Sequence, residues 1–240
     1  MRLDRRRVVV TGGSAGIGLA VAHRLSKQGD SVFVCGRNAE RVRDAVIQLG
    51  VASPKSGIGG AVCDVRILSS VEEMMGKAAS FLGGIDGLVN CAGIGVIKEF
   101  GEMTPMFWSE MIATNLTGVF NCSHTALPHL KEAAAKIGAA DIINLGSRSG
   151  RYAFQGGSGY NATKFGLQGM TEAMFLDLNR FGIRVGLVAP GTVATGFAGT
   201  EAADWQLHPE DVADAVQAMI CARIGACMNW IELRPARPPA

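Results

Sequence analysis

Short apolar runs alternate with amphipathic stretches along the whole chain. Runs such as VVV and SVFV carry hydrophobic residues at consecutive positions, which is typical of parallel strands covered on both faces. The runs predict strands at residues 7–11, 31–35, 58–63, 86–90, 141–146, 183–188 and 228–233. Strands that alternate with helices in this way predict an α/β Rossmann fold, a doubly wound parallel sheet with helices on both faces.

The segments between these runs have helical periodicity. Apolar residues three or four positions apart give such a segment one face that can be buried. Two faces show the pattern most clearly, Ile17, Ala20, Val21 and Leu25 in one segment and Leu167, Met170, Met174 and Leu178 in another. Pro209 predicts the start of a further helix, because proline suits the first turn and the acids Glu210 and Asp211 oppose the helix dipole.

The chain of 240 residues contains no low-complexity linker or charge run that would divide it. We therefore expect one domain over residues 1–240, with a short irregular tail at 235–240. No apolar run reaches the ~18 residues that a membrane-spanning helix needs. No apolar signal core precedes the first strand, so the sequence predicts a cytoplasmic protein with no membrane partner.

Charge and cysteine content exclude several classes of partner. The net charge is +2, which gives no reason to expect nucleic acid, and the arginines at 5–7 are best explained as solvated residues, with a basic patch as the alternative. The six cysteines include no CxxC pair. Cys35, Cys63 and Cys91 lie near strand ends, where free cysteine commonly packs as a small hydrophobe. We expect neither disulfides nor a metal site.

A glycine-rich turn, TGGSAGIG at residues 11–18, follows the first predicted strand and opens the first helix. Gly12 permits the tight turn, Gly16 lets the backbone approach a pyrophosphate, and Gly18 permits close packing of the helix. The free N–H groups at the helix start favour phosphate. The turn therefore predicts a dinucleotide-binding site.

A second motif carries acid–base chemistry. Tyr160 and Lys164 are one helical turn apart, Ser147 ends a predicted strand thirteen residues before Tyr160, and Asn115 lies in the preceding long helix. A tyrosine hydroxyl can protonate the alkoxide formed when a ketone is reduced, but its ordinary pKa near ~10 makes it a poor base for the reverse reaction. The ammonium of Lys164 would favour the phenolate.

Together these motifs resemble the short-chain dehydrogenase/reductase family across nearly the whole chain. The three residues between Gly12 and Gly16 resemble its shorter-chain branch. The resemblance implies hydride transfer between a nicotinamide dinucleotide and a carbonyl or secondary alcohol. It also implies a catalytic tetrad of Asn115, Ser147, Tyr160 and Lys164. In it the serine binds the substrate oxygen, the lysine also binds the nicotinamide ribose, and the asparagine holds a water that links the lysine to solvent.

The same resemblance implies a cofactor site spread over several strand ends. Asp64 in CDV corresponds to the aspartate that contacts adenine, and PGTVAT at 190–195 matches the segment beside the nicotinamide carboxamide. NCAG at 90–93 resembles a motif usually written NNAG, so Cys91 is a mild departure. The implied cofactor-binding residues are Gly12, Ser14, Gly16, Ile17, Gly18, Arg37, Asp64, Val65, Asn90, Ala92, Gly93, Tyr160, Lys164, Pro190, Gly191, Val193 and Thr195.

The turn after the second strand predicts a preference for NADP(H) over NAD(H). Enzymes that prefer NAD usually place an acid there to hold the ribose hydroxyls. This sequence has Gly36 in that place and Arg37 next to it, and a guanidinium can pair with a 2′-phosphate through two hydrogen bonds. Many NADP-using relatives add a basic residue just before the middle glycine, where this chain has Ala15, so the preference can be partial.

The substrate side is less defined. In the loop at 196–207, Phe197 and Trp205 either cap a substrate or anchor the loop. Arg148 and Arg151 are best explained as solvated residues, with an anionic or carrier-bound substrate as the alternative. MNWIELRP at 228–235 resembles a subgroup that includes 3-hydroxy acid and amino acid dehydrogenases. The sequence therefore favours a ketone reductase or 3-hydroxy acid-type dehydrogenase that acts on a small molecule.

Two alternatives stay open. A 3-oxoacyl reductase with carrier-bound substrates fits the body of the chain but fits its C-terminal pattern less well. A regulatory Rossmann protein that senses dinucleotide without catalysis typically lacks part of the active set, which is complete here. By resemblance we also expect a homodimer or homotetramer, packed through the helices of Asn115 and Tyr160 with an apolar face of Met170, Met174 and Phe175.

Overall fold

The structure, a computed structural model, describes residues 5–199 and 201–237. It contains one seven-stranded parallel sheet of order β3-β2-β1-β4-β5-β6-β7. The strands are β1 (Arg7–Thr11), β2 (Ser31–Gly36), β3 (Ile58–Val62), β4 (Gly87–Asn90), β5 (Ala140–Leu145), β6 (Ile183–Pro190) and β7 (Trp230–Leu233). The predicted doubly wound sheet is confirmed, with strand limits that agree to within about two residues.

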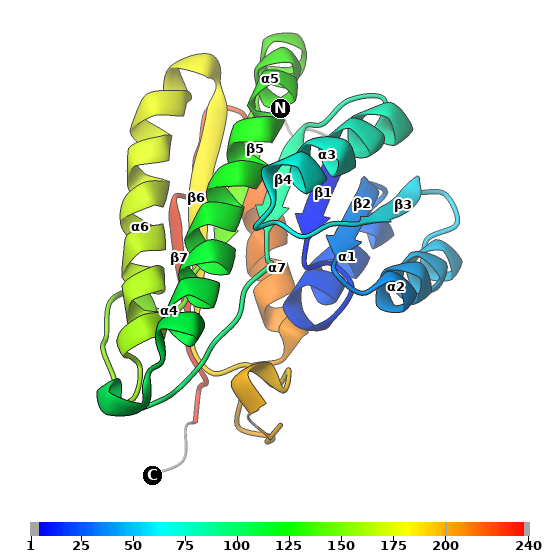
Figure 1. Cartoon of the computed structure of the whole chain (residues 1–240). Helices are drawn as coiled ribbons and strands as arrows, with labels where there is room; N and C mark the ends of the chain where they lie inside the picture. The colour runs from blue at the N-terminus through cyan, green and yellow to red at the C-terminus, as the bar shows by residue number, and fades with distance from the viewer. Residues whose placement is uncertain (1–4, 200, 238–240) are drawn as a thin grey trace.

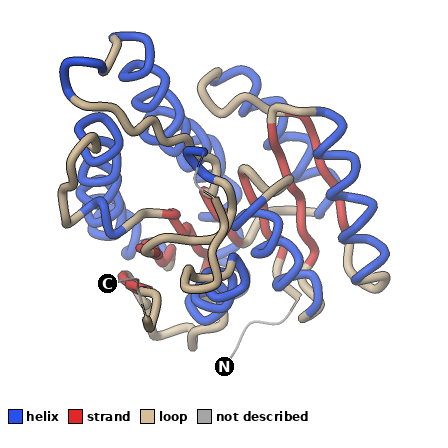
Figure 2. The backbone as a smooth tube through the Cα atoms, turned by 90° about the horizontal axis from the view of Figure 1, so that it is seen from below, coloured by secondary structure: helices blue, strands red, loops and turns tan. Residues whose placement is uncertain are grey.

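Helices cover both faces of this sheet (Figures 1 and 2). The α-helices are α1 (Gly16–Lys27), α2 (Ala39–Ala52), α3 (Leu68–Leu82), α4 (Pro105–Ile112), α5 (Gly118–Ile137), α6 (Ser158–Leu178) and α7 (Pro209–Ile220). α1, α2 and α7 enclose one buried apolar cluster, and α3, α5 and the end of α6 enclose another on the opposite face. Two covered faces explain why the strands are apolar at consecutive positions rather than at alternate ones.

The register of the parallel strands brings their carboxyl ends to one edge. Thr11 at the end of β1 pairs with Cys35 on one side and with Asn90 on the other. Asn90 in turn pairs with Asn144 near the end of β5. In an open α/β sheet, ligands bind beyond this edge, where the strand order reverses. Here β1 lies between β2 and β4, so the reversal falls beside the glycine-rich turn.

The helix patterns are confirmed. Val21 and Leu25 of α1 are fully buried, and Leu167 is buried in α6. α7 begins at Pro209, where Asp211 accepts a hydrogen bond from the backbone N–H of His208. Residues 235–237 form neither helix nor strand, and residues 238–240 of the predicted tail lie outside the described part. No helix among the described residues is long and apolar enough to cross a membrane.

The apolar face that we expect to join subunits packs partly within its own chain. Met170, Met174 and Phe175 are half-buried and pack against the apolar clusters of their own chain. Because α6 lies against β6, this side of the helix faces the sheet. The exposed apolar side chains of the same layer are instead Met106, Trp108, Phe120, Phe165 and Leu176 on α4, α5 and α6.

Candidate active site

The glycine-rich turn allows β1 to pass directly into α1. Gly12 has φ +64°, a left-handed conformation that disfavours a side chain. A Cβ at Gly18 would lie 2.3 Å from the carbonyl oxygen of Gly12, so the close approach of α1 to the turn requires glycine there. The first turn of α1 carries no acidic residue. Its free N–H groups and positive potential therefore suit a pyrophosphate, and the residues present fit a dinucleotide.

The turn is joined to the NCAG segment by hydrogen bonds. The Thr11 hydroxyl accepts from the backbone N–H groups of Cys91 and Ala92, both at 3.1 Å. The Asn90 side chain lies in the core instead, where its amide donates to Asn144 at 2.9 Å and to Ser123 at 3.1 Å. Asn90 therefore fixes the end of β4, and its side chain does not line the cavity. The residues that follow it in the chain, Cys91, Ala92 and Gly93, do line it. Burial raises the pKa of Cys91 to about 12, so this thiol is neutral.

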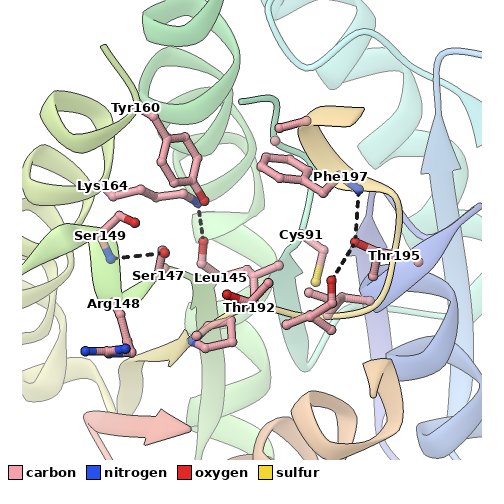
Figure 3. Close-up of a pocket in the computed structure, with 18 of the residues that line it drawn as sticks. Cys91, Leu145, Ser147, Arg148, Ser149, Tyr160, Lys164, Thr192, Thr195 and Phe197 are labelled. Atoms are coloured by element: carbon pink, nitrogen blue, oxygen red, sulfur yellow. Dashed lines mark hydrogen bonds between the residues drawn. The ribbon is translucent and has the colours of Figure 1, made fainter. Parts of the chain in front are cut away.

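A cavity of about 810 Å³ runs from the glycine-rich turn to the predicted chemical groups (Figure 3). A volume of this order suits a cofactor together with a small substrate. Predicted residues that line it are Gly12, Gly16, Ile17, Gly18, Ala92, Gly93, Ser147, Tyr160, Lys164, Pro190, Gly191, Val193 and Thr195. The fold therefore gathers segments from four strand ends and three α-helices around one space.

Ser147, Tyr160 and Lys164 converge at one end of this cavity (Figure 3). Lys164 is buried and donates to the Leu145 carbonyl at 2.8 Å, with its Nζ 5.6 Å from the centre of the Tyr160 ring. The Ser147 oxygen accepts from the Ser149 N–H at 3.1 Å, and its hydroxyl donates toward Tyr160. The three side chains are held by the end of β5 and the first turns of α6.

Burial is the largest cause of the pKa shifts of Tyr160 and Lys164. The pKa of Tyr160 is raised by burial, and the hydrogen bond from Ser147 opposes this shift. The net shift of the Tyr160 pKa is therefore upward, opposite in direction to the shift expected from the Lys164 ammonium. Burial also lowers the pKa of Lys164 to about 8, so its positive charge is itself destabilised. Tyr160 is thus a protonated acid at neutral pH in this structure.

Asn115 lies in a single π-helical turn, Ala113–Thr117, between α4 and α5. Its side chain exchanges two hydrogen bonds with the backbone of Ile94, at 2.8 and 2.9 Å, and donates to Thr163 at 3.1 Å. It does not line the cavity, but it connects the segment after NCAG to the helix that carries Tyr160 and Lys164. The π-helical turn is the local irregularity that aims this side chain inward.

Several predicted cofactor residues do not line the cavity, namely Ser14, Arg37, Asp64, Val65 and Asn90. Ser14 packs over the end of β2, because a Cβ at Gly36 would lie 2.7 Å from the Ser14 hydroxyl oxygen. Arg37 is exposed at this end of β2. The Val65 carbonyl accepts from Asn121 at 3.0 Å, which fixes the segment after β3.

The sequence reasoning missed Arg41, which lines the cavity, as does Ala15. It occupies the first turn of α2, whose N-cap Asn38 accepts from the Arg41 N–H at 2.9 Å. Its position four residues after Arg37 was the available signal. Other lining residues without a predicted role are Ile97, Leu145, Tyr152, Phe154 and Thr192.

The substrate loop contributes one aromatic residue to the cavity. Phe197 lies across the cavity from Tyr160, with ring centres 5.8 Å apart (Figure 3). Three backbone positions next to it have positive φ, Gly196 at +70°, Ala198 at +56° and Gly199 at +76°. Trp205 does not line the cavity. Of the two alternatives for these aromatics, capping fits Phe197 and anchoring fits Trp205.

The arginines after the catalytic serine have partners on β7. Arg148 points away from Tyr160 in Figure 3, and its Nε lies 3.5 Å from a Glu232 oxygen. Arg151 lies over the Trp230 ring at 5.2 Å. Both side chains thus connect the active-site loop to the last strand. Among the described residues no group of three His, Cys, Asp or Glu side chains could hold a metal ion, and the six cysteines are free thiols.

The fold and the cavity define a dinucleotide-binding oxidoreductase. The sequence profile of the family described as short chain dehydrogenase matches residues 6–206. The chain therefore belongs to the short-chain dehydrogenase family, whose members act on CH–OH and C=O groups. The 3alpha-hydroxysteroid dehydrogenase of Mediterraneibacter gnavus is 34% identical over 195 residues, covering 81% of this chain and 76% of the relative.

Two solved structures are similar over nearly their whole length. Serine dehydrogenase in complex with NADP⁺ has 30% identity and a TM-score of 0.83, covering 94% of this chain and 93% of that one. A variant of actinorhodin polyketide ketoreductase with NADPH has 30% identity and a TM-score of 0.86, covering 98% and 97%.

Proposed function

We propose that this protein is a cytoplasmic, NADP(H)-dependent oxidoreductase that interconverts a small ketone and its secondary alcohol. The observation that carries the proposal is the convergence of Ser147, Tyr160 and Lys164 at one end of a cavity whose other end is the glycine-rich turn. When bound there, the nicotinamide supplies hydride to the carbonyl carbon or accepts it from the alcohol. The protein must then move one proton at the substrate oxygen.

Tyr160 moves that proton. In reduction its hydroxyl protonates the substrate oxygen, and its raised pKa keeps it in the protonated form that this step needs. The Ser147 hydroxyl, which already donates toward Tyr160, hydrogen-bonds the substrate oxygen and stabilises its developing charge. Lys164 holds the nicotinamide ribose and returns a proton to Tyr160. Asn115, bound to Ile94 and Thr163, positions a water between Lys164 and solvent.

A preference for NADP(H) follows from the end of β2. Gly36 leaves no acid to repel a 2′-phosphate, and Ser14 fills the space above it. Arg37 follows immediately, and Arg41 lines the cavity from the first turn of α2, as Ala15 does from the glycine-rich turn. Arg41 can therefore take the place of the basic residue that many NADP-using relatives carry in the glycine-rich turn. The similar structures solved with NADP⁺ and NADPH support this assignment.

The substrate is a small ketone or 3-hydroxy acid rather than a carrier-bound acyl group. Phe197, Tyr152, Phe154 and Ile97 line the cavity near Tyr160 and favour a compact, partly apolar molecule. The similarity to serine dehydrogenase supports this class. The similarity to a polyketide ketoreductase supports the alternative, a 3-oxoacyl reductase.

A panel of free ketones, 3-hydroxy acids and acetoacetyl thioester, followed by NADPH absorbance, tests both the reaction class and the substrate class. Turnover of free ketones or 3-hydroxy acids with a higher kcat/KM than the thioester supports the proposal. A preference for the thioester supports the alternative substrate, and no turnover of any compound contradicts the reaction class.

The proposed assembly is a homodimer or homotetramer. The exposed aromatic residues Trp108, Phe120 and Phe165 are on α4, α5 and α6, the layer where we expect subunits to meet. Light scattering at micromolar concentration tests this, with Phe165→Glu as the variant that shifts the protein toward monomer. A monomeric unmodified protein contradicts it.

A further inference from the structure

The aspartate implied to contact adenine is already held by an arginine. Asp64 follows the end of β3, and its carboxylate accepts from Arg66 Nε at 2.9 and 3.1 Å and from Arg66 Nη2 at 2.6 Å. The backbone N–H of Arg66 adds a fourth hydrogen bond at 3.1 Å. A fork of this kind, with two oxygens facing one guanidinium, is among the stronger and most geometrically defined ion pairs. The pair fixes both the orientation and the charge balance of Asp64.

Arg37 lies on the segment next to that of Asp64, and its charge acts on the same carboxylate. The Cys63 N–H donates to the Gly36 carbonyl at 3.0 Å, so the residues after β2 and β3 leave the sheet side by side. The pKa of Asp64 is lowered, chiefly by the hydrogen bond from Arg66, and the charge of Arg37 contributes to the same shift. These are the two cations that act on this carboxylate. Within the described residues, Arg37 itself has no hydrogen bond or ion pair.

The two arginines therefore share one acid unequally. The Asp64 carboxylate accepts four hydrogen bonds from Arg66 and none from Arg37. A carboxylate this close to Arg37 would otherwise neutralise it and repel any phosphate placed beside it. Because Asp64 is paired with Arg66, the guanidinium of Arg37 at the end of β2 stays available.

We infer that Arg66 is a positioning residue for cofactor selection: it engages Asp64 and so leaves Arg37 available for the 2′-phosphate of NADP(H). The inference rests on the proposed preference for NADP(H). It assigns to Arg66 an effect on the 2′-phosphate that requires no contact with the phosphate. The same pairing explains how one edge of the sheet can hold Asp64, suited to adenine, and Arg37, suited to phosphate, without the two neutralising each other's charge.

The test compares two nucleotide fragments that differ by the 2′-phosphate, 2′,5′-ADP and 5′-AMP, by calorimetric binding to the full chain. Because both fragments contain adenine, any change in the adenine contact cancels in the ratio of their Kd values. We expect Arg66→Ala to lower the preference for 2′,5′-ADP by at least about fivefold, a size typical of coupled neighbouring charges. Arg66→Lys should retain part of the preference.

The second arm removes the acid. In an Asp64→Asn background, Arg66→Ala should change the ratio by less than about twofold, because no carboxylate remains to capture Arg37. Arg43→Ala is the matched control, since Arg43 is an exposed arginine of α2 paired only with its neighbour Asp44. Its ratio should stay that of the unmodified protein. Thermal unfolding of each variant verifies that the fold is retained.

Three outcomes overturn the inference. An unchanged ratio in Arg66→Ala shows that Arg66 has no effect on the 2′-phosphate. An equal loss in the Asp64→Asn background shows that Arg66 contacts the phosphate directly. Equal binding of both fragments by the unmodified protein removes the NADP(H) preference, and the role of Arg66 with it, while the reaction class stays testable through Tyr160→Phe.

Discussion

The two ends of the cavity control charge in opposite ways. At the nucleotide end Arg37 is exposed, and the partly exposed Asp64 and Arg66 are joined in an ion pair. At the chemical end Tyr160 and Lys164 are enclosed, and burial decides theirs, raising one pKa and lowering the other.

This contrast follows from what each end must do. Selecting a phosphate requires a permanent charge that solvent can reach, and a guanidinium stays protonated under all conditions of interest. Moving a proton requires a group whose two protonation states are both accessible, which burial and a neighbouring charge can arrange. Changes at the chemical end should therefore alter rate and pH dependence, and changes at the nucleotide end should alter cofactor choice.

The largest expected effect is at Tyr160. Tyr160→Phe removes the proton donor while keeping the ring, so turnover should fall by about 10³-fold or more, within the upper range for general acid–base catalysis. Dinucleotide affinity, measured by fluorescence titration, should stay within a few-fold. Near-native turnover on the best substrate would rule out the proposed mechanism.

Lys164→Ala is the companion variant. Lys164 is assigned both to the ribose and to the proton route, so turnover and dinucleotide affinity should both decline. A loss of turnover with unchanged dinucleotide affinity would show that Lys164 does not bind the ribose.

The pH dependence is the next largest effect. Oxidation needs the Tyr160 phenolate, which is the minor form because the Tyr160 pKa is raised. The kcat/KM for alcohol oxidation should therefore rise about tenfold per pH unit below that pKa. Reduction uses the phenol and should be level at neutral pH, then decline above about 8 as Lys164 loses its proton. Profiles from pH 6 to 10 in both directions measure this, and a flat oxidation profile would contradict it.

Cofactor choice should change by a smaller factor. We expect the unmodified protein to favour NADPH over NADH in kcat/KM by at least about tenfold, or 1.4 kcal/mol. Gly36→Asp combined with Arg37→Leu should reverse this, because the new carboxylate meets the ribose hydroxyls and no guanidinium remains beside it. The new side chain also displaces the Ser14 hydroxyl, so Ser14→Ala is a useful background. Equal use of both cofactors by the unmodified protein would show that Arg37 does not reach the phosphate.

The smallest effect is expected at Phe197, which faces Tyr160 at 5.8 Å. Phe197→Ala should raise KM for the ketone about two- to tenfold, the range of a lost aromatic contact. It should also admit water to Tyr160, lower its pKa and move the oxidation profile to lower pH. Unchanged KM and profile would assign Phe197 to the loop alone, and Trp205→Ala, outside the cavity, is the control.

The sequence alone determined the order of strands and helices along the chain. Consecutive apolar residues and helical periodicity depend on local burial patterns, which survive in a linear sequence. The residues of the glycine-rich turn and the spacing of Ser147, Tyr160 and Lys164 were also readable, because each role needs a particular residue type at a particular distance from an element end.

Only the tertiary structure decided the electrostatics. The Tyr160 pKa depends on how completely neighbouring segments exclude water, and no spacing along the chain encodes that. The entry of Arg41 into the cavity and the inward packing of Met170 likewise depend on which elements meet in the fold. Contacts between distant segments set the energy of each charge. The sequence therefore predicted which residues carry the chemistry, and only the tertiary structure showed how their surroundings shift their pKa values.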